Sequence, residues 1–158
     1  MKFDFKKYII RVVKFFLYFI TLTTIMLTVF VIATKQPFDL DTLLQPGSLP
    51  RMGVMLSIFA FIYPLIGFTS QNVYINKPFE EDRKTIEDVF ANSRYIVTES
   101  TETTITFRHS SSFSRLLNIY EDAIVLDFSD NPLTLTGSRK NVTRFSRMIT
   151  YAITEREE

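Results

Sequence analysis

The sequence predicts a membrane protein of two parts, an N-terminal hairpin of two transmembrane helices and a small C-terminal α+β domain. The first 70 residues hold two long uncharged segments, and the residues that follow are polar, with short stretches of β-branched and aromatic residues. Charge divides in the same way, because residues 1–76 carry 7 basic and 3 acidic residues whereas residues 77–158 carry 11 basic and 14 acidic ones. The near-neutral total therefore hides a basic N-terminal half and a mildly acidic C-terminal domain.

The first uncharged segment covers residues 15–34. Its 20 residues would span about 30 Å at roughly 1.5 Å per residue, the thickness of a bilayer's hydrocarbon core. The basic leader, residues 1–14, also suits a cleaved signal peptide, but the apolar core of such a peptide is about 7 to 15 residues long and ends at a site of small residues. We therefore expect an uncleaved transmembrane helix.

A second uncharged segment, residues 52–70, reaches the lower length limit of a spanning helix. Pro64 is tolerable within it, because neighbouring helices can satisfy the carbonyl that a proline leaves free, and it predicts a kink. A re-entrant or interfacial segment is the alternative. The two segments leave a loop at residues 35–51 and a linker at residues 71–77.

Lys and Arg around the two segments predict that both termini are cytoplasmic and that the loop is external, in an inner (cytoplasmic) membrane. The loop has basic residues only at its ends, with two aspartates between them. The basic residues are Lys2, Lys6, Lys7, Arg11 and Lys14 in the leader, Lys35 and Arg51 in the loop, and Lys77, Arg83 and Lys84 after the second segment. The leader is also expected to touch anionic lipid headgroups.

Small residues recur along one face of the second segment, at intervals of 4, 3, 4 and 3. They are Gly53, Ser57, Ala60, Pro64 and Gly67, and the first segment offers Thr21, Thr24 and Thr28. Because apolar burial does not drive helix association in lipid, such residues predict close packing, within the hairpin or between protomers. The alternative is that Gly and Thr are simply common in such helices. Neither segment contains Asp, Glu, Lys, Arg or His, which argues against a solute pathway.

Residues 78–158 predict a helix, five antiparallel strands in a meander and a C-terminal amphipathic helix. Pro78 and the acids after it favour a helix start at residues 78–93. The strands are expected at residues 95–98, 103–108, 116–120, 123–128 and 133–136, since the connections between them are too short for helical crossovers. Gly137 and Ser138 are read as a turn and helix cap before a helix at residues 139–154.

This order of elements, from residue 95 to residue 153, resembles the second half of pleckstrin-homology-like domains. Here it follows a two-pass hairpin, as in many small bacterial membrane proteins. The resemblance implies a half barrel that binds proteins or lipid headgroups and is seldom an enzyme. Five strands stand where the family has seven, and no functional residue of the family has a counterpart in this sequence.

Four basic residues begin the C-terminal helix, Arg139, Lys140, Arg144 and Arg147, and the last three share one face. Basic residues in a first turn oppose the helix dipole, so a bound anion would relieve the penalty. The anion would be a lipid headgroup or a soluble phospho-ligand. The simpler alternative is a solvated face that pairs with acids such as Glu80, Glu81 or Asp130.

Catalytic, metal and cofactor sites are not expected. The chain has no Cys and a single histidine, His109, which excludes thiolate sites and multi-histidine metal sites. His109 stands beside Ser110, Ser111 and Ser112, but no nucleophile-elbow motif accompanies them, and the sequence has no phosphate-binding loop or dinucleotide fingerprint. The net charge of residues 77–158 argues against nucleic acid.

The sequence thus predicts a non-enzymatic two-pass membrane protein whose cytoplasmic domain binds a partner protein or anionic headgroups, as an adaptor, scaffold or accessory subunit. Self-association through the hairpin is a second expectation. The alternative is a ligand-responsive oligomeric membrane effector or a pore-forming protein.

Overall fold

The computed structural model of the chain describes residues 5–35 and 47–157. It divides into two compact units, Met1–Leu65 and Ile66–Glu158, and each is considered by itself. The first four residues of the predicted leader, and most of the predicted external loop (residues 36–46), lie outside the described residues.

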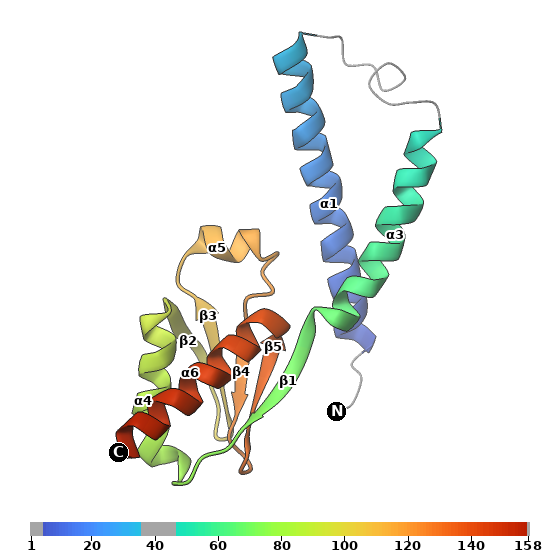
Figure 1. The fold of residues 1–158 in the computed structure, drawn as a ribbon. Coiled ribbons are helices and arrows are strands. Elements are labelled where there is room, and N and C mark those ends of the chain that lie inside the picture. The colour runs from blue at the N-terminus through green and yellow to red at the C-terminus, as the bar shows by residue number, and fades with distance from the viewer. Residues whose placement is uncertain (1–4, 36–46, 158) are drawn as a thin grey trace. The chain divides into compact units, whose positions relative to one another are not determined.

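The N-terminal unit consists of two helices, α1 (Phe5–Thr34) and α3 (Ser48–Ile66), which lie side by side at one end and diverge toward the other (Figure 1). Both are long and apolar enough to cross a membrane. They touch where the Tyr8 hydroxyl donates to the Phe61 carbonyl, at 2.9 Å, and where the rings of Phe15 and Tyr63 stack with centroids 4.7 Å apart. Most of the predicted leader is therefore the start of α1, not a separate segment.

The C-terminal unit is a five-stranded antiparallel sheet with two long helices and one short helix. In chain order the elements are β1 (Phe68–Val73), α4 (Phe79–Asn92), β2 (Tyr95–Ser100), β3 (Thr104–His109), α5 (Ser112–Leu117), β4 (Ile124–Asp127), β5 (Leu133–Ser138) and α6 (Arg139–Glu157). The strand order is β1-β5-β4-β3-β2. The expected meander is confirmed for β2 to β5, while β1 reaches the edge beside β5.

Two boundaries predicted near β1 are wrong. Residues 68–70 were expected to end the second apolar helix and residues 71–77 to form a linker, but α3 ends at Ile66 and residues 68–73 form β1. The sequence does not show the alternation of apolar and polar residues that predicts a strand, because β1 is short and polar and Val73 is its only fully buried residue. Gly67 consequently lies outside α3.

The strand expected at residues 116–120 is also wrong, because α5 and the loop after it occupy this stretch. The Ser111 side chain accepts from the Ser114 N–H and so caps the helix. Ile119 and Tyr120 follow with φ angles of +56°, a left-handed conformation that a β-strand does not contain. The fifth strand of the sheet is β1 instead.

Gly137 and Ser138 are not a turn but the last two residues of β5, from which α6 starts directly. A Cβ atom at Gly137 would stand 2.9 Å from the Ala123 carbonyl oxygen. The glycine is therefore required by the close approach of two backbones, not by a change of chain direction.

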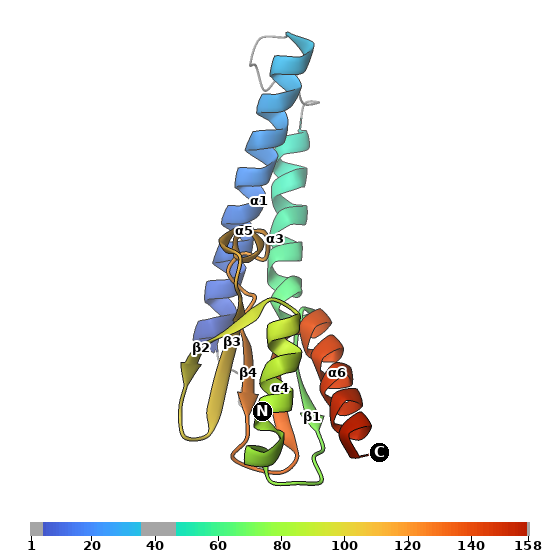
Figure 2. The same cartoon turned by 90° about the vertical axis from the view of Figure 1, so that its left-hand side faces the viewer.

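The core lies between one face of the sheet and the helices α4 and α6, which both pack on that face (Figure 2). Its centre is a stack of aromatic rings, with Phe90 of α4 against Phe107 of β3 at 3.8 Å and against Phe145 of α6 at 4.3 Å. The other face carries hydroxyl groups, such as those of Ser70 and Thr136, which hydrogen-bond at 2.8 Å. The alternation in the strands thus separates an apolar face from a polar one.

Candidate functional site

One end of the sheet receives the chain from α3, and we call it the linked end. β1 begins at Phe68, with only Gly67 between it and the last residue of α3. The register pairs Phe68 with Ser138 and Tyr95 with His109. Since α6 follows Ser138 and the α5 loop follows His109, the start of α6 and all of α5 lie at the linked end as well (Figure 1).

The four basic residues predicted as a binding face are all exposed on α6. They are Arg139, Lys140, Arg144 and Arg147. Arg139 donates its backbone N–H to the Gly67 carbonyl at 2.8 Å, which ties the start of α6 to the point where the chain arrives. The Arg144 guanidinium donates to the Ser93 hydroxyl at 3.4 Å and lies 5.7 Å from the centre of the Phe145 ring.

None of these four side chains forms an ion pair within residues 5–35 and 47–157. Of the acids considered as partners, Glu80 lies 3.8 Å from Arg83 on its own helix, and Asp130 lies in the β4–β5 loop at the opposite end of the sheet. The face is therefore a set of basic groups without carboxylates to neutralise them.

Three further basic residues join this end of the sheet, and the sequence alone does not reveal them. They are Arg94 before β2, Arg108 in β3 and Arg115 in α5. Each belongs to a different element, so no helical or strand spacing groups them with the start of α6. Only the register of the sheet brings them together.

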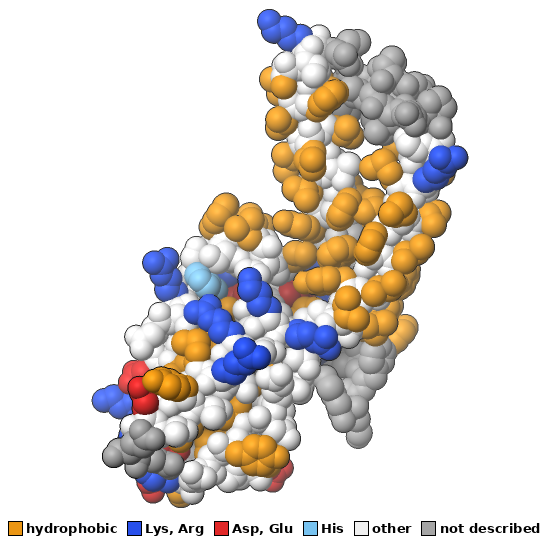
Figure 3. Space-filling model, in the orientation of Figure 1, with side chains coloured by type: hydrophobic (Ala, Val, Ile, Leu, Met, Phe, Trp, Pro, Cys, Tyr) orange, Lys and Arg blue, Asp and Glu red, His pale blue; other side chains and the backbone are white. Residues whose placement is uncertain are grey.

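Acidic residues gather at the opposite end, which we call the far end. They include Glu80 and Glu81 at the start of α4, Glu99 and Glu102 around the β2–β3 turn, Asp130 between β4 and β5, and Glu155 near the end of α6. In Figure 3, Lys and Arg gather on the part of this unit near α5, and most of the red side chains lie away from it. Residues 77–158, with 11 basic and 14 acidic residues, have a net charge of 11 − 14 = −3, and this value conceals a basic linked end and an acidic far end.

Four large apolar side chains project from α5 and the loop after it. Each is at least half exposed, and the set is Phe113, at 68%, with Leu116, Leu117 and Tyr120. Figure 3 shows hydrophobic side chains clustered on this part of the surface. The exposure is local, because the neighbouring strands bury their apolar residues in the core.

A buried carboxylate holds the base of the α5 loop. Asp122 is fully buried, and its Oδ2 accepts the His109 N–H at 2.8 Å and lies 3.9 Å from Nε of Arg115. Arg115 in turn donates to the His109 carbonyl. The second carboxylate oxygen of Asp122 has no hydrogen-bond partner in the described part of the chain. Both strands that carry α5 are thus fixed at the point where it leaves the sheet.

Tyr95 connects this polar cluster to α6. Its hydroxyl accepts from the Asn141 amide at 3.1 Å. Burial raises the pKa of the Tyr95 phenol above its ordinary value, the negative charge of Asp122 raises that pKa further, and Arg144 opposes both effects. The phenol therefore stays neutral and keeps its hydrogen bond at physiological pH.

His109 and the nearby serines serve the local structure. His109 Nδ1 accepts the Ser111 N–H at 3.0 Å, and Ser111 caps α5. Asp127 and Asp130, two acids that a Ser-His-Asp triad with His109 could use, lie at the far end, away from His109. Among the residues that the structure describes, no group of three or more His, Asp or Glu side chains is placed to hold a metal ion.

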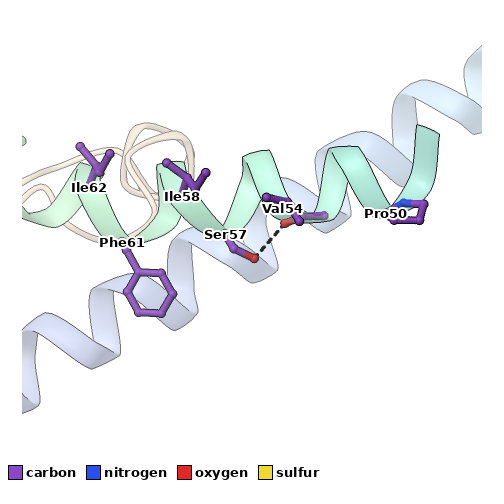
Figure 4. Close-up of a pocket in the computed structure, with 7 residues that line it drawn as sticks. Pro50, Val54, Ser57, Ile58, Phe61 and Ile62 are labelled. Carbon is purple, nitrogen blue, oxygen red and sulfur yellow. Dashed lines mark hydrogen bonds between the residues drawn. The ribbon is translucent and has the colours of Figure 1, made fainter. Parts of the chain in front are cut away.

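The predicted packing residues of the hairpin divide into two groups. Ala60 and Pro64 are buried, close to the contacts between α1 and α3. Toward the other end of α3, Ser57 donates to the Gly53 carbonyl and lines an open hollow of about 600 Å³ (Figure 4). The hollow is lined by Pro50, Gly53, Val54, Ser57, Ile58, Phe61 and Ile62.

The threonines of α1 are exposed and bond within their own helix. Thr21, Thr24 and Thr28 each donate to the carbonyl four residues earlier, at 2.8 to 2.9 Å. Such bonds satisfy the hydroxyl groups without a second helix. In the described hairpin these threonines do not form a common seam with the small residues of α3.

Comparison with protein-family models, with curated proteins and with solved structures found no match to this chain. Any function must therefore be inferred from the residues themselves.

Replacing Asp122 by alanine should loosen the α5 loop. The His109 N–H would lose its acceptor, at a cost of about 1 to 3 kcal/mol for a buried group left unpaired. Hydrogen exchange in the full-length protein in detergent should become faster across residues 109–122, while the exchange of Phe90 and Phe145 changes little. The control is Asp130→Ala, an exposed acid at the far end, and equal exchange in both variants would contradict the role of Asp122.

Proposed function

We propose that the chain is a two-pass membrane protein, with both termini in the cytoplasm, whose α+β domain presents its basic linked end to anionic lipid headgroups. In this role it is a non-enzymatic adaptor, scaffold or accessory subunit. The observation that carries the proposal is the separation of charge along the domain, with the basic end at the point where the chain arrives from α3.

The membrane part of the proposal is supported by length, composition and flanking charge. The uncharged part of α1 and the whole of α3 match the hydrocarbon thickness of a bilayer. Lys6, Lys7, Arg11 and Lys14 lie at the N-terminal end of α1, where the positive-inside rule keeps them in the cytoplasm. With two spans, the C-terminal domain lies on the same side as this end.

Distance decides which charges of the domain act on the membrane. One residue separates α3 from β1, so the Cα atoms of Ile66 and Phe68 are at most about 7 Å apart. The linked end therefore stays near the end of the span. A six-residue strand is about 20 Å long, and salt screens charges over about 8 Å, so the acids of the far end weaken the field of the linked end only slightly.

Several basic residues together give an attraction of useful size. Each Lys or Arg near an anionic membrane surface contributes roughly 1 kcal/mol. Among the described residues no carboxylate pairs with the four side chains of α6, so none has to be displaced before they meet headgroups. A partner protein with an acidic surface is the alternative occupant of the same face, and lipid dependence distinguishes the two.

The topology is tested with single cysteines, which the natural chain lacks. Ser48→Cys, at the start of α3, should react with a membrane-impermeant maleimide on intact cells. Glu102→Cys, in the β2–β3 turn, should react only after the cells are lysed. The reverse pattern would place the domain outside, and labelling of both sites on intact cells would remove the two-pass arrangement.

The headgroup contact is tested with charge-matched pairs of variants. Lys140→Ala with Arg147→Ala removes two positive charges from the proposed face, and Lys77→Ala with Lys84→Ala removes two from outside it. In nanodiscs with phosphatidylglycerol, residues 139–147 should exchange hydrogen more slowly than in phosphatidylcholine alone. The first pair should lose this protection and the control pair should keep it.

Protection that does not depend on phosphatidylglycerol would contradict the proposal. Adding Arg139→Ala and Arg144→Ala extends the test to the whole face. Protection that disappears at high salt in the unaltered protein would support it, since exposed charges are screened.

The second candidate function is an oligomeric membrane effector or pore, and the hollow on α3 favours it. Figure 4 shows Ile58 and Ile62 projecting to one side of this helix and Phe61 to the other. Small residues at the base of such a hollow allow a second helix to approach closely.

Self-association is tested by filling the hollow. Ser57→Leu should prevent close approach and reduce the oligomeric mass seen by native mass spectrometry of the gently extracted protein. Met55→Leu is the control, because this residue is exposed on α3 outside the hollow. A monomeric unaltered protein, or an oligomer that persists in Ser57→Leu, would count against this candidate.

A further inference from the structure

Several large apolar side chains are exposed together on the α5 loop, and the distribution of charge in the α+β unit does not explain them. We call this group the apolar tip, and it consists of Phe113, Leu116, Leu117 and Tyr120. Isolated exposed apolar residues are ordinary, but four on one short loop leave a contiguous surface that normally has an occupant.

The tip is held in place by the structure beneath it. Asp122 and Arg115 fix the two chain segments that carry it, and the Ser111 cap fixes the start of the helix. Ile119 and Tyr120 both adopt a left-handed conformation, which costs free energy in residues with side chains of this size. The fold thus maintains the exposed position of the tip at some cost in stability.

The basic residues at the same end of the sheet indicate which kind of molecule covers the apolar tip. Arg94 and Arg108 lie at the same end of the sheet, together with Arg139 and Lys140 of α6, whereas Arg115 is already paired with Asp122. An apolar tip with basic groups at the same end of the domain matches the boundary between anionic headgroups and acyl chains, where interfacial helices bury their apolar side chains. A purely apolar protein partner would desolvate the exposed basic groups beside it without supplying anions.

We propose that the apolar tip inserts into the cytoplasmic leaflet of the membrane that the hairpin spans, as a second membrane attachment of the same chain. The inference rests on the proposed two-pass topology, which brings the linked end to the membrane through the single residue Gly67. Insertion of the tip and headgroup contact by α6 then fix the orientation of the domain at two separate points.

The test uses a single nitroxide label in the full-length protein, which has no cysteine of its own. The label is placed at Phe113→Cys, and a control label at Glu102→Cys in the far-end turn. In liposomes containing phosphatidylglycerol, the Phe113→Cys label should collide more with oxygen, which concentrates in lipid, than with a water-soluble nickel chelate. The Glu102→Cys label should show the opposite ratio.

A second variant ensures that the label reports on insertion. Leu117→Glu in the Phe113→Cys background should shift the collision ratio toward water, whereas Asn118→Glu, a polar position on the same loop, should shift it less. Both positions are exposed, so neither change removes a residue from the core. An equal shift in the two variants would overturn insertion.

The remaining outcomes separate this inference from the proposed function. A Phe113→Cys label that is accessible to the nickel chelate, while residues 139–147 stay protected by phosphatidylglycerol, would overturn the tip inference and leave headgroup contact standing. A label shielded from both reagents would show that protein covers the tip, and this would overturn the inference as well.

Discussion

The pairing of β1 with β5 is the interaction on which the rest of the α+β unit depends. Six residue pairs, from Phe68 with Ser138 to Val73 with Leu133, attach the first strand to the last. Because α6 follows β5 without a loop, this pairing also places the start of α6 next to the point where the chain arrives, and the hydrogen bond from Arg139 to Gly67 completes the junction. This pairing therefore places the basic start of α6 beside the point where the chain arrives.

The core supports the same arrangement with few residues. About 80 residues give only a thin core, and here it lies on one side of the sheet, where Phe90 stacks between Phe107 and Phe145. The chain can leave the second face polar because Ser70 and Thr136 satisfy each other across β1 and β5. Because Gly137 has no side chain, its backbone can approach the Ala123 carbonyl closely, and β5 pairs with β4 close to the start of α6.

Much of this architecture is predictable from the sequence, and the exceptions have physical reasons. Alternating apolar residues in β3, β4 and β5 and the helical spacing in α6 are strong signals, and these four elements form as predicted. The polar strand β1 carries no such signal, because only Val73 among its six residues is fully buried. The leucines and aromatic residues of α5 and the following loop are also typical of a strand, and only the Ser111 cap indicates a helix. The basic residues of α6 were predictable from helical spacing, whereas Arg94, Arg108 and Arg115 required the register.

The separation of charge within the domain has a consequence before any contact is made. A body with a basic end and an acidic end has an electric dipole moment, so the field of an anionic surface exerts a torque on it as well as an attraction. A neutral domain on the same short connection would sample orientations at random near the bilayer. Under the proposed membrane attachment, this domain would be turned toward its bound orientation before contact, to a degree set by lipid composition and ionic strength.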